Sequence, residues 1–221
     1  AQAALVVANA SNVAVTRTQI FGSSAIFAVF FAGHDVTAGQ ASLDNFASRI
    51  EMDTNNSIAD SVVSSPWTGD SLSFSLQYLG TVRNNTVIDG GKIAYYMNAN
   101  GSCVDNTVLN SISQGIYISS PSFGNLIMNN SLLNTTYAGI KSQRQYEHEP
   151  DGVVFDMSSS ADIIQGNTIE SNSYIGIELN DVHCIGVYYN KIMRHKSSPG
   201  IYLQSSENVS IWRNDVTIFD N

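Results

Sequence analysis

Gly176-Ile177-Glu178-Leu179 is the stretch that decides the fold, because its pattern recurs along the chain. Glycine followed by Ile or Val is spaced by 24, 13, 24 and 24 residues, at Gly115, Gly139, Gly152, Gly176 and Gly200. A second series, Asn followed two positions later by an aliphatic residue, has spacings of 21, 24, 37, 23 and 24, at Asn85, Asn106, Asn130, Asn167, Asn190 and Asn214. Since 37 exceeds 24 by 13, both series indicate a repeat of about 24 residues with one 13-residue insertion.

A repeat of this length holds about three short strands joined by turns, and one such coil cannot bury its apolar face alone. The first and third residues after each glycine should point inward and the second and fourth outward, because side chains alternate along a strand. The Asn series is expected to form a ladder of side-chain amides at a turn. The sequence therefore predicts an all-β, right-handed parallel β-helix. The predicted inward pairs are Ile116/Ile118, Val153/Phe155, Ile177/Leu179 and Ile201/Leu203.

The whole chain, residues 1–221, is predicted to be a single β-helix domain. It is 43% hydrophobic, enough for one sizeable core. Loop insertions are expected near residues 38–45, 64–70 and 141–151. No second domain or capping helix is recognisable, and the coil around Leu5 repeats the pattern of the coil around Ile201. Because uncapped solenoid ends expose strand edges, we expect either end-to-end stacking of identical subunits or a longer parent chain.

The excess of acidic over basic residues limits the partners that the chain can bind. With 10 Lys and Arg against 19 Asp and Glu, the net charge is −9, which argues against nucleic acid as a partner.

No apolar run is long enough to insert into a membrane. Ala1-Gln2-Ala3 resembles the residues around a signal-peptidase cleavage site, which favours an extracellular or cell-surface location. Glycosylation sequons would matter in a host that glycosylates exported proteins; they begin at Asn9, Asn55, Asn84, Asn100, Asn129, Asn134 and Asn208.

Cys103 and Cys184 are the two cysteines of the chain. More than three coils separate them, so their backbones should be roughly 15 Å apart, too far for a disulfide. Both are interpreted as small packing residues.

The motifs N-x-I, G-I-x-L and N-V-x-I, as in Asn167-Thr168-Ile169, Gly176-Ile177-Glu178-Leu179 and Asn208-Val209-Ser210-Ile211, resemble the β-helix repeats of the pectin-lyase-like superfamily. The resemblance covers most of the chain and implies the fold. The superfamily includes lyases, glycosidases, epimerases, phage tailspikes and adhesins, so the resemblance does not specify one chemistry. The polygalacturonase-like series (Asn-Thr-Asp, Asp-Asp, Gly-His-Gly, Arg-Ile-Lys) and the epimerase-like Asp-Pro-His motif are absent, although Pro150-Asp151-Gly152 resembles the end of the first element.

The outward positions of the Gly-Ile-x-Leu strands predict a polysaccharide-binding face. Aromatic rings suit sugar faces, and amides and carboxylates suit sugar hydroxyls. The alternative is an ordinary solvated sheet face. The second positions after glycine are Tyr117, Lys141, Val154, Glu178 and Tyr202; the fourth are Ser119, Gln143, Asp156, Asn180 and Gln204, with Tyr96 and Asn98 expected to continue the two rows.

The insertion, Lys141–Asp156, is rich in ionisable groups: seven of its 16 residues are charged or His. Sites concentrate in loops that project from rigid scaffolds, although such a loop can also be merely a soluble surface feature. In the predicted register, Asp156 and Glu178 lie on adjacent coils, two residues apart along the strand, at roughly 8 Å. This separation suits the acid and base of an inverting glycosidase.

A lyase or epimerase would use other residues of the same region. Tyr146 and His148 could act as acid or base, while Lys141 and Arg144 could neutralise a uronate carboxylate. Ca²⁺ is a candidate cofactor. Its oxygen ligands would come from Asp151 and Asp181, with Asp156, Glu178 and Asn180 nearby.

Three functional hypotheses follow. The first is an extracellular carbohydrate-active β-helix, either a glycoside hydrolase or a lyase or epimerase, with Tyr96, Tyr117, Asn180 and Tyr202 among its substrate contacts. The second is a non-catalytic structural or adhesive solenoid that stacks end to end, as a filament subunit, surface protein or tailspike segment. The third is a carbohydrate-binding module without turnover. The loop beside a carboxylate-rich and cation-bearing face favours the first.

Overall fold

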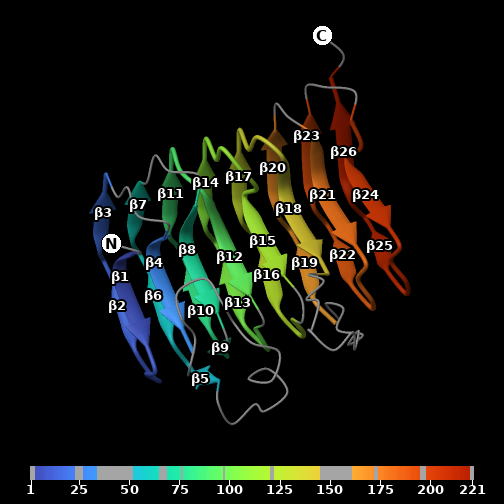
Figure 1. The fold of residues 1–221 in the computed structure, drawn as a ribbon. Coiled ribbons are helices and arrows are strands. Elements are labelled where there is room, and N and C mark those ends of the chain that lie inside the picture. Colours follow the sequence, from blue (N-terminus) through green and yellow to red (C-terminus); the bar gives the residue numbers. More distant parts are fainter. Residues whose placement is uncertain are drawn as a thin grey trace, which may run out of the picture.

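The computed structural model describes residues 3–22, 27–33, 52–64, 69–75, 77–96, 98–119, 122–144, 161–171, 174–194 and 198–219. Within these ranges the chain forms three parallel sheets of eight strands each, with no helix, and winds repeatedly from sheet A to sheet B to sheet C (Figure 1). Every strand pairs with its counterparts in the neighbouring coils. The predicted all-β parallel β-helix is therefore confirmed.

Each sheet is built from one strand per coil. Sheet A contains β1 (Ala3–Ala8), β4 (Phe27–Ala32), β8 (Asp70–Ser75), β12 (Lys92–Tyr96), β15 (Ile116–Ser119), β18 (Ala138–Gln143), β21 (Ile175–Asn180) and β24 (Ile201–Gln204). Sheet B contains β2 (Ala14–Thr16), β6 (Ser57–Ala59), β10 (Thr81–Arg83), β13 (Ser102–Val104), β16 (Leu126–Met128), β19 (Ile163–Gln165), β22 (Gly186–Tyr188) and β25 (Ser210–Trp212). Sheet C contains β3 (Gln19–Phe21), β7 (Val62–Ser64), β11 (Thr86–Ile88), β14 (Thr107–Leu109), β17 (Ser131–Leu133), β20 (Thr168–Ser171), β23 (Lys191–Arg194) and β26 (Asp215–Ile218). A short pair, β5 (Asp53–Thr54) and β9 (Gln77–Tyr78), completes the strands.

The core lies between the three sheets and consists of side chains stacked from coil to coil. Ile116 pairs with Ile140, Ile140 with Ile177, and Ile177 with Ile201, so the predicted aliphatic stack on sheet A is confirmed. Phe31, Phe74 and Tyr95 continue the second inward row as a stack of rings, with centroids 4.3 Å and 5.8 Å apart. Burying such rows removes apolar surface from water at about 25 cal/mol per Å², a gain that one coil alone does not have.

The sheet A strand that the sequence predicts between Ile140 and Ile177 is wrong. β18 pairs directly with β21, so the inward pair Val153/Phe155 has no place between Ile140 and Ile177. Lys141 and Gln143 belong to β18, and the extra residues therefore follow the strand and precede β19. Residues 145–160 lie outside the described part of the chain, as do the insertion expected near 38–45 and most of the one near 64–70.

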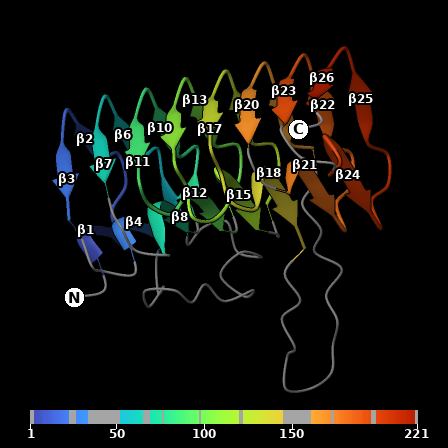
Figure 2. The ribbon, with the colours of Figure 1, turned by 90° about the horizontal axis from the view of Figure 1, so that it is seen from above.

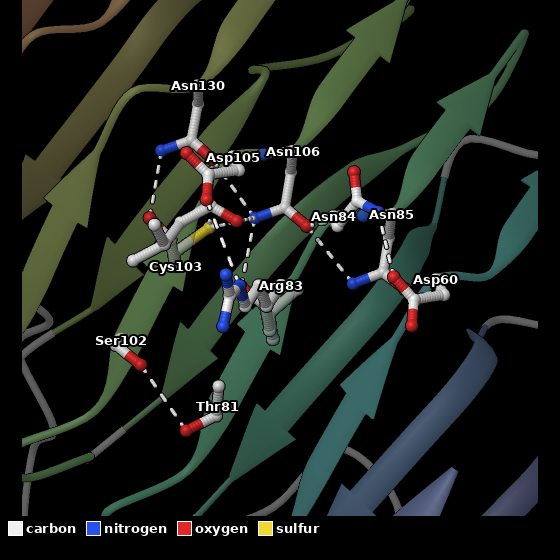
Figure 3. Close-up of polar contacts among 12 residues, drawn as sticks. Asp60, Thr81, Arg83, Asn84, Asn85, Ser102, Cys103, Asp105, Asn106 and Asn130 are labelled. Carbon is white, nitrogen blue, oxygen red and sulfur yellow. Dashed lines mark hydrogen bonds and ion pairs between the residues drawn. The ribbon is translucent and has the colours of Figure 1, made fainter. Parts of the chain in front are cut away.

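The predicted amide ladder is confirmed at the turn between sheets B and C (Figure 3). The backbone N and Nδ2 of Asn106 both donate to Oδ1 of Asn130 at 3.0 Å, and Nδ2 also donates to the Val82 carbonyl oxygen at 3.0 Å. Buried amides therefore satisfy one another and the backbone of the preceding coil, as buried polar groups require. The ladder consists of Asn85, Asn106, Asn130, Asn167, Asn190 and Asn214.

The repeated glycines stand where the chain passes from sheet C to sheet A. A Cβ on Gly176 would lie 2.4 Å from the Gly200 carbonyl oxygen and 2.5 Å from Cγ2 of Ile192. Gly139 and Gly200 are equally crowded. The glycines are thus required by the close approach of two sheets, and their period marks the corner of each coil.

The seven sequons reflect the geometry of the corners. Each sequon Asn is exposed and has a positive φ, between 51° and 56°. Asn adopts this left-handed conformation more readily than most residues. In Asn84-Asn85-Thr86 and Asn129-Asn130-Ser131, the second residue is the buried ladder Asn and the third opens the next strand. At these two corners the sequon pattern therefore follows from the backbone geometry of the coil and from the position of the ladder Asn.

Both cysteines are free thiols, as predicted. Cys103 is buried beside the ladder, and burial raises the pKa of its thiol. The interpretation of Cys184 as a packing residue is wrong, because it is exposed at a corner with φ 55°. No helix in the described ranges is long and apolar enough to cross a membrane.

Candidate functional site

The outward side chains of sheet A form two rows, which define the candidate site. Tyr117, Lys141, Glu178 and Tyr202 occupy matching positions on β15, β18, β21 and β24, as the sequence predicts. In the second row, Ser119, Gln143, Asn180 and Gln204 match the prediction, whereas Asp156 has no place between Gln143 and Asn180. The members of the second row are Tyr96, Ser119, Gln143, Asn180 and Gln204.

Tyr96 and Asn98 are displaced by two residues from their predicted positions. Tyr96 pairs with Ser119, and Ala94 takes the position beside Tyr117. Asn98 lies beyond the strand, buried at the turn, where its Oδ1 accepts from the backbone N of Gln77 at 2.7 Å. The turn between β11 and β12 is two residues shorter than the turn between β14 and β15, so positions counted back from β15 by the spacing of the Asn series fall two residues too far along the chain. Tyr96 thus stays on the face, and Asn98 is structural.

Lys141 and Glu178 form an ion pair across adjacent coils. Lys141 Nζ lies 2.9 Å from Glu178 Oε1, and both side chains are mostly buried. Asn180 Nδ2 donates to the same carboxylate oxygen at 2.7 Å. Partial burial strengthens these contacts relative to an exposed pair. The result is a cation, a carboxylate and an amide held together on one patch of the sheet.

Tyr117 on β15 contacts side chains of both neighbouring strands, β12 and β18. Its hydroxyl oxygen accepts a hydrogen bond from Gln143 Nε2 at 2.6 Å, and its ring packs edge-on against Tyr96, with centroids 5.7 Å apart. Lys92 Nζ lies 5.0 Å from the centroid of the same ring, within cation–π range. Burial raises the pKa of Tyr117, so the phenol stays protonated at neutral pH and can donate a hydrogen bond.

Asp70 and Lys92 form a second ion pair that sequence reasoning missed. Asp70 Oδ1 lies 3.0 Å from Lys92 Nζ, and Asp70 is almost completely buried. Burial raises the pKa of the Asp70 carboxyl, and the charge of Lys92 opposes that rise. Burial and the negative charge of Asp70 together raise the pKa of Tyr96. The spacing of Asp70 and Lys92 in the sequence, close to one coil, could have indicated the ion pair, but a register shift between Lys92 and Ile93 obscures it.

Exposure increases along the face from the N-terminal coils to the C-terminal ones. Along the first row, Ser73 and Ala94 are fully buried, Tyr117 is 9% exposed and Tyr202 is 38% exposed. Several buried oxygens have no hydrogen-bond partner among the described residues: Asp70 Oδ2, Ser71 Oγ and Ser73 Oγ on β8, and Asn180 Oδ1 on β21. A buried oxygen without a hydrogen bond lowers the stability of the fold unless water or a ligand binds it.

Because exposure rises from Tyr117 to Tyr202, the accessible part of the site spans β15 to β24.

The remaining predicted residues divide into two groups. Tyr146, His148, Asp151 and Asp156 lie outside the described part of the chain. The register that put Asp156 next to Glu178 is wrong, because Lys141 and Gln143 occupy the neighbouring strand. Arg144 follows β18, and its backbone N donates to the Asn180 carbonyl oxygen at 3.1 Å.

Asp181 lies at the corner after β21 with φ 52°. Among the described residues, no three His, Cys, Asp or Glu side chains are arranged to hold a metal ion. The predicted Ca²⁺ site depends on Asp151 and so stays a prediction.

The comparisons with known proteins agree with the fold. The family described as "Periplasmic copper-binding protein (NosD)" matches residues 142–218, less than half of the chain. The described residues of that segment contain no cluster of metal ligands that would suit copper. No curated protein matches the chain.

Two solved structures are similar. The A-module of mannuronan C-5 epimerase AlgE6 from Azotobacter vinelandii is 16% identical, with a TM-score of 0.62 over 85% of this chain and 44% of that module. The surface protein and adhesin PfbA of Streptococcus pneumoniae is 13% identical, with a TM-score of 0.48 over 97% of this chain and 68% of that protein. The first likeness shows the fold alone, and the chain spans less than half of the epimerase module. The second is too weak to support an argument.

Proposed function

We propose that the chain is an extracellular or cell-surface β-helix that binds a polysaccharide on the outer face of sheet A. The observation that carries the proposal is the double row on β15 to β24, where two tyrosines, an ion pair and three amides share one half-open surface. Phenol rings can stack on sugar rings, and amides and carboxylates can hydrogen-bond sugar hydroxyls. The orphaned Asn180 Oδ1 offers an acceptor for such a hydroxyl.

Hydrolysis by a pair of carboxylates has little support in the described residues. Glu178 and Asp70 are separated by four ladder steps along sheet A. At about 4.8 Å per step, this is roughly 19 Å, well beyond the about 6.5–9.5 Å of an inverting pair.

Lyase or epimerase chemistry is the second candidate. Tyr117 and the cation of Lys92 lie against each other, and Lys141 occupies the next coil. A protonated phenol can serve as a general acid, and lysines can neutralise a uronate carboxylate. The name of the similar epimerase module favours the same substrate class.

Binding and catalysis are tested with the same panel of variants. The whole chain is titrated with alginate, polygalacturonate and neutral glucan oligosaccharides by calorimetry, and the uronates are assayed for unsaturated products and for changed C5 configuration. Tyr202→Ala and Lys141→Met should each weaken binding by about tenfold, equivalent to about 1.4 kcal/mol. Phe21→Ala, an exposed aromatic on sheet C, is the matched control. Equal affinities for all four proteins, or no binding of any glycan, would contradict the proposal.

A further inference from the structure

Tyr189, Trp212 and Arg213 form a cluster of two aromatic rings and a cation at the turn between sheets B and C. The ring centroids of Tyr189 and Trp212 are 5.4 Å apart in an edge-on arrangement. The Arg213 guanidinium lies 4.3 Å from the centroid of Trp212 and 6.0 Å from that of Tyr189. Trp212 is 52% exposed and Tyr189 46% exposed. The turns between sheets B and C lie on the side of the solenoid away from sheet A (Figure 2). The cluster is therefore separate from the site described above.

The backbone at this corner disfavours the side chains that occupy it. Tyr189 and Arg213 have φ of 55° and 52°. Bulky residues rarely adopt this conformation, which costs about 1–2 kcal/mol relative to the right-handed one. From the second coil to the sixth, the same position holds residues that tolerate it, namely Asp60, Asn84, Asp105, Asn129 and Gly166. Arg17, at the same corner of the first coil, also has a positive φ of 51°, so long side chains occupy this corner in the first coil and in the last two.

Arg213 is a cation without a carboxylate partner in the described structure. Its closest polar contact is the Tyr189 hydroxyl, 3.5 Å from one guanidinium nitrogen. Arg83, at the same corner, lies 3.8 Å from Asp105 (Figure 3). Among the described residues, Arg213 is the cation that lies over an indole ring, 4.3 Å from its centroid, with no carboxylate within ion-pair distance. Its planar fork is pre-organised to bind an oxyanion with two hydrogen bonds.

We infer that this cluster binds an acidic saccharide, with the carboxylate or sulfate of one sugar on Arg213 and an apolar sugar face against Trp212 and Tyr189. Charge complementarity favours this ligand class, since a carboxylate or sulfate can accept two hydrogen bonds from the guanidinium. The net charge of −9 disfavours a nucleic acid, because a polyphosphate backbone needs many cations. The inference does not depend on the function proposed for sheet A.

The whole chain is titrated with tetrasaccharides of galacturonate and of glucose, and binding is followed by tryptophan fluorescence and by calorimetry. The galacturonate oligomer should change the fluorescence, and Trp212→Ala should remove that change. Arg213→Gln should weaken binding by about tenfold, whereas Arg213→Lys, which keeps the charge without the planar fork, should weaken it less. Phe21→Ala should bind like the wild type, and thermal unfolding of every variant checks that the fold is intact.

Tyr202→Ala separates this site from the one on sheet A. If the Trp212 signal persists in Tyr202→Ala, the corner site acts independently, as inferred. The inference fails if the neutral glucose oligomer binds equally well, if Arg213→Gln has no effect, or if the signal is lost in Tyr202→Ala but kept in Trp212→Ala. Failure of the sheet A variants to affect binding would contradict the proposed function and leave the corner site standing.

Discussion

Lys141 and Glu178 lie side by side on adjacent coils of sheet A, with Nζ and Oε1 2.9 Å apart, although 37 residues separate them in the sequence. β18 pairs directly with β21 in sheet A. The pair therefore depends on this register, which brings together strands that are more than one standard coil apart in sequence. It forms the centre of the proposed binding face.

Breaking this pair should destabilise the chain more than removing both charges. Lys141→Met leaves the mostly buried Glu178 carboxylate with Asn180 as its hydrogen-bond partner among the described residues, and we expect the free energy of unfolding to fall by about 1–2 kcal/mol. The double variant Lys141→Met/Glu178→Gln should recover part of that loss. Urea denaturation of the four proteins in a double-mutant cycle measures the coupling. Additivity within about 0.5 kcal/mol would show that the two residues do not interact in solution.

Asn167→Ala should damage the amide ladder severely. Oδ1 of Asn167 accepts from both the backbone N and Nδ2 of Asn130 at 2.9 Å, and its Nδ2 donates to the Ile127 carbonyl oxygen at 3.0 Å. Each buried group left without a partner costs about 1–3 kcal/mol, so we expect a loss of about 3 kcal/mol or more. Asn100→Gly, at an exposed corner, is the control and should change stability by less than about 0.5 kcal/mol. Similar losses in both variants would rule out a special role for the ladder.

Leu79→Asn should stabilise the chain. Leu79 is 44% exposed and has φ 58°, a conformation that Asn tolerates better than Leu. Asn55 and Asn100 occupy the same corner in the neighbouring coils, with φ of 56° and 52°. We expect the unfolding free energy to rise by about 0.5–1 kcal/mol, measured by chemical denaturation. Ile112→Asn, an exposed position without a positive φ, should give no such gain.

Asp162→Asn should change the pH dependence of stability. Asp162 is fully buried, its Oδ1 accepts from the backbone N and Nδ2 of Asn125, and its Oδ2 has no partner. Burial raises its pKa from 3.8 to about 7, against the effect of the two Asn125 hydrogen bonds. The folded chain therefore holds a proton that the unfolded chain releases, and stability should fall as the pH rises from about 4 towards about 7.

The variant lacks this titration, because an amide has no proton to lose in that range. Above pH 7 it should be more stable than the wild type, by on the order of a few kcal/mol, and the advantage should shrink towards pH 4. Thermal unfolding of both proteins across this range measures the difference. A constant difference at every pH would mean that Asp162 is ionised in the folded chain with an ordinary pKa.

Much of the architecture could be read from the spacing of a few residue types. Asn106 and Asn130 stand 24 residues apart because each satisfies the other in neighbouring coils, and Ile177 lies next to Ile201 for the same periodic reason. These features repeat from coil to coil, so each repeat of the spacing is further evidence for the same coil length. The rows that contain Lys141, Glu178 and Tyr202 followed from the same period.

The errors arose where the period is interrupted. Gly152-Val153 has the same pattern as the true corner dipeptides, so the pattern predicts a further sheet A strand there and places Asp156 beside Glu178. The turn before β12 is two residues shorter than the turn before β15, which displaces Tyr96, and the register shift at Lys92 conceals its pair with Asp70. A local sequence pattern does not tell which dipeptides begin a strand of sheet A.

The sequence alone determined the coil length, the inward stacks and the amide ladder, because these depend on contacts between residues at a constant spacing. Only the tertiary structure decided which carboxylate meets Lys141, and that Tyr189, Trp212 and Arg213 gather at one corner. Those contacts depend on the backbone hydrogen bonds that set the register across an irregular coil, and on side-chain packing between coils. Neither of these produces a periodic pattern in the amino-acid sequence.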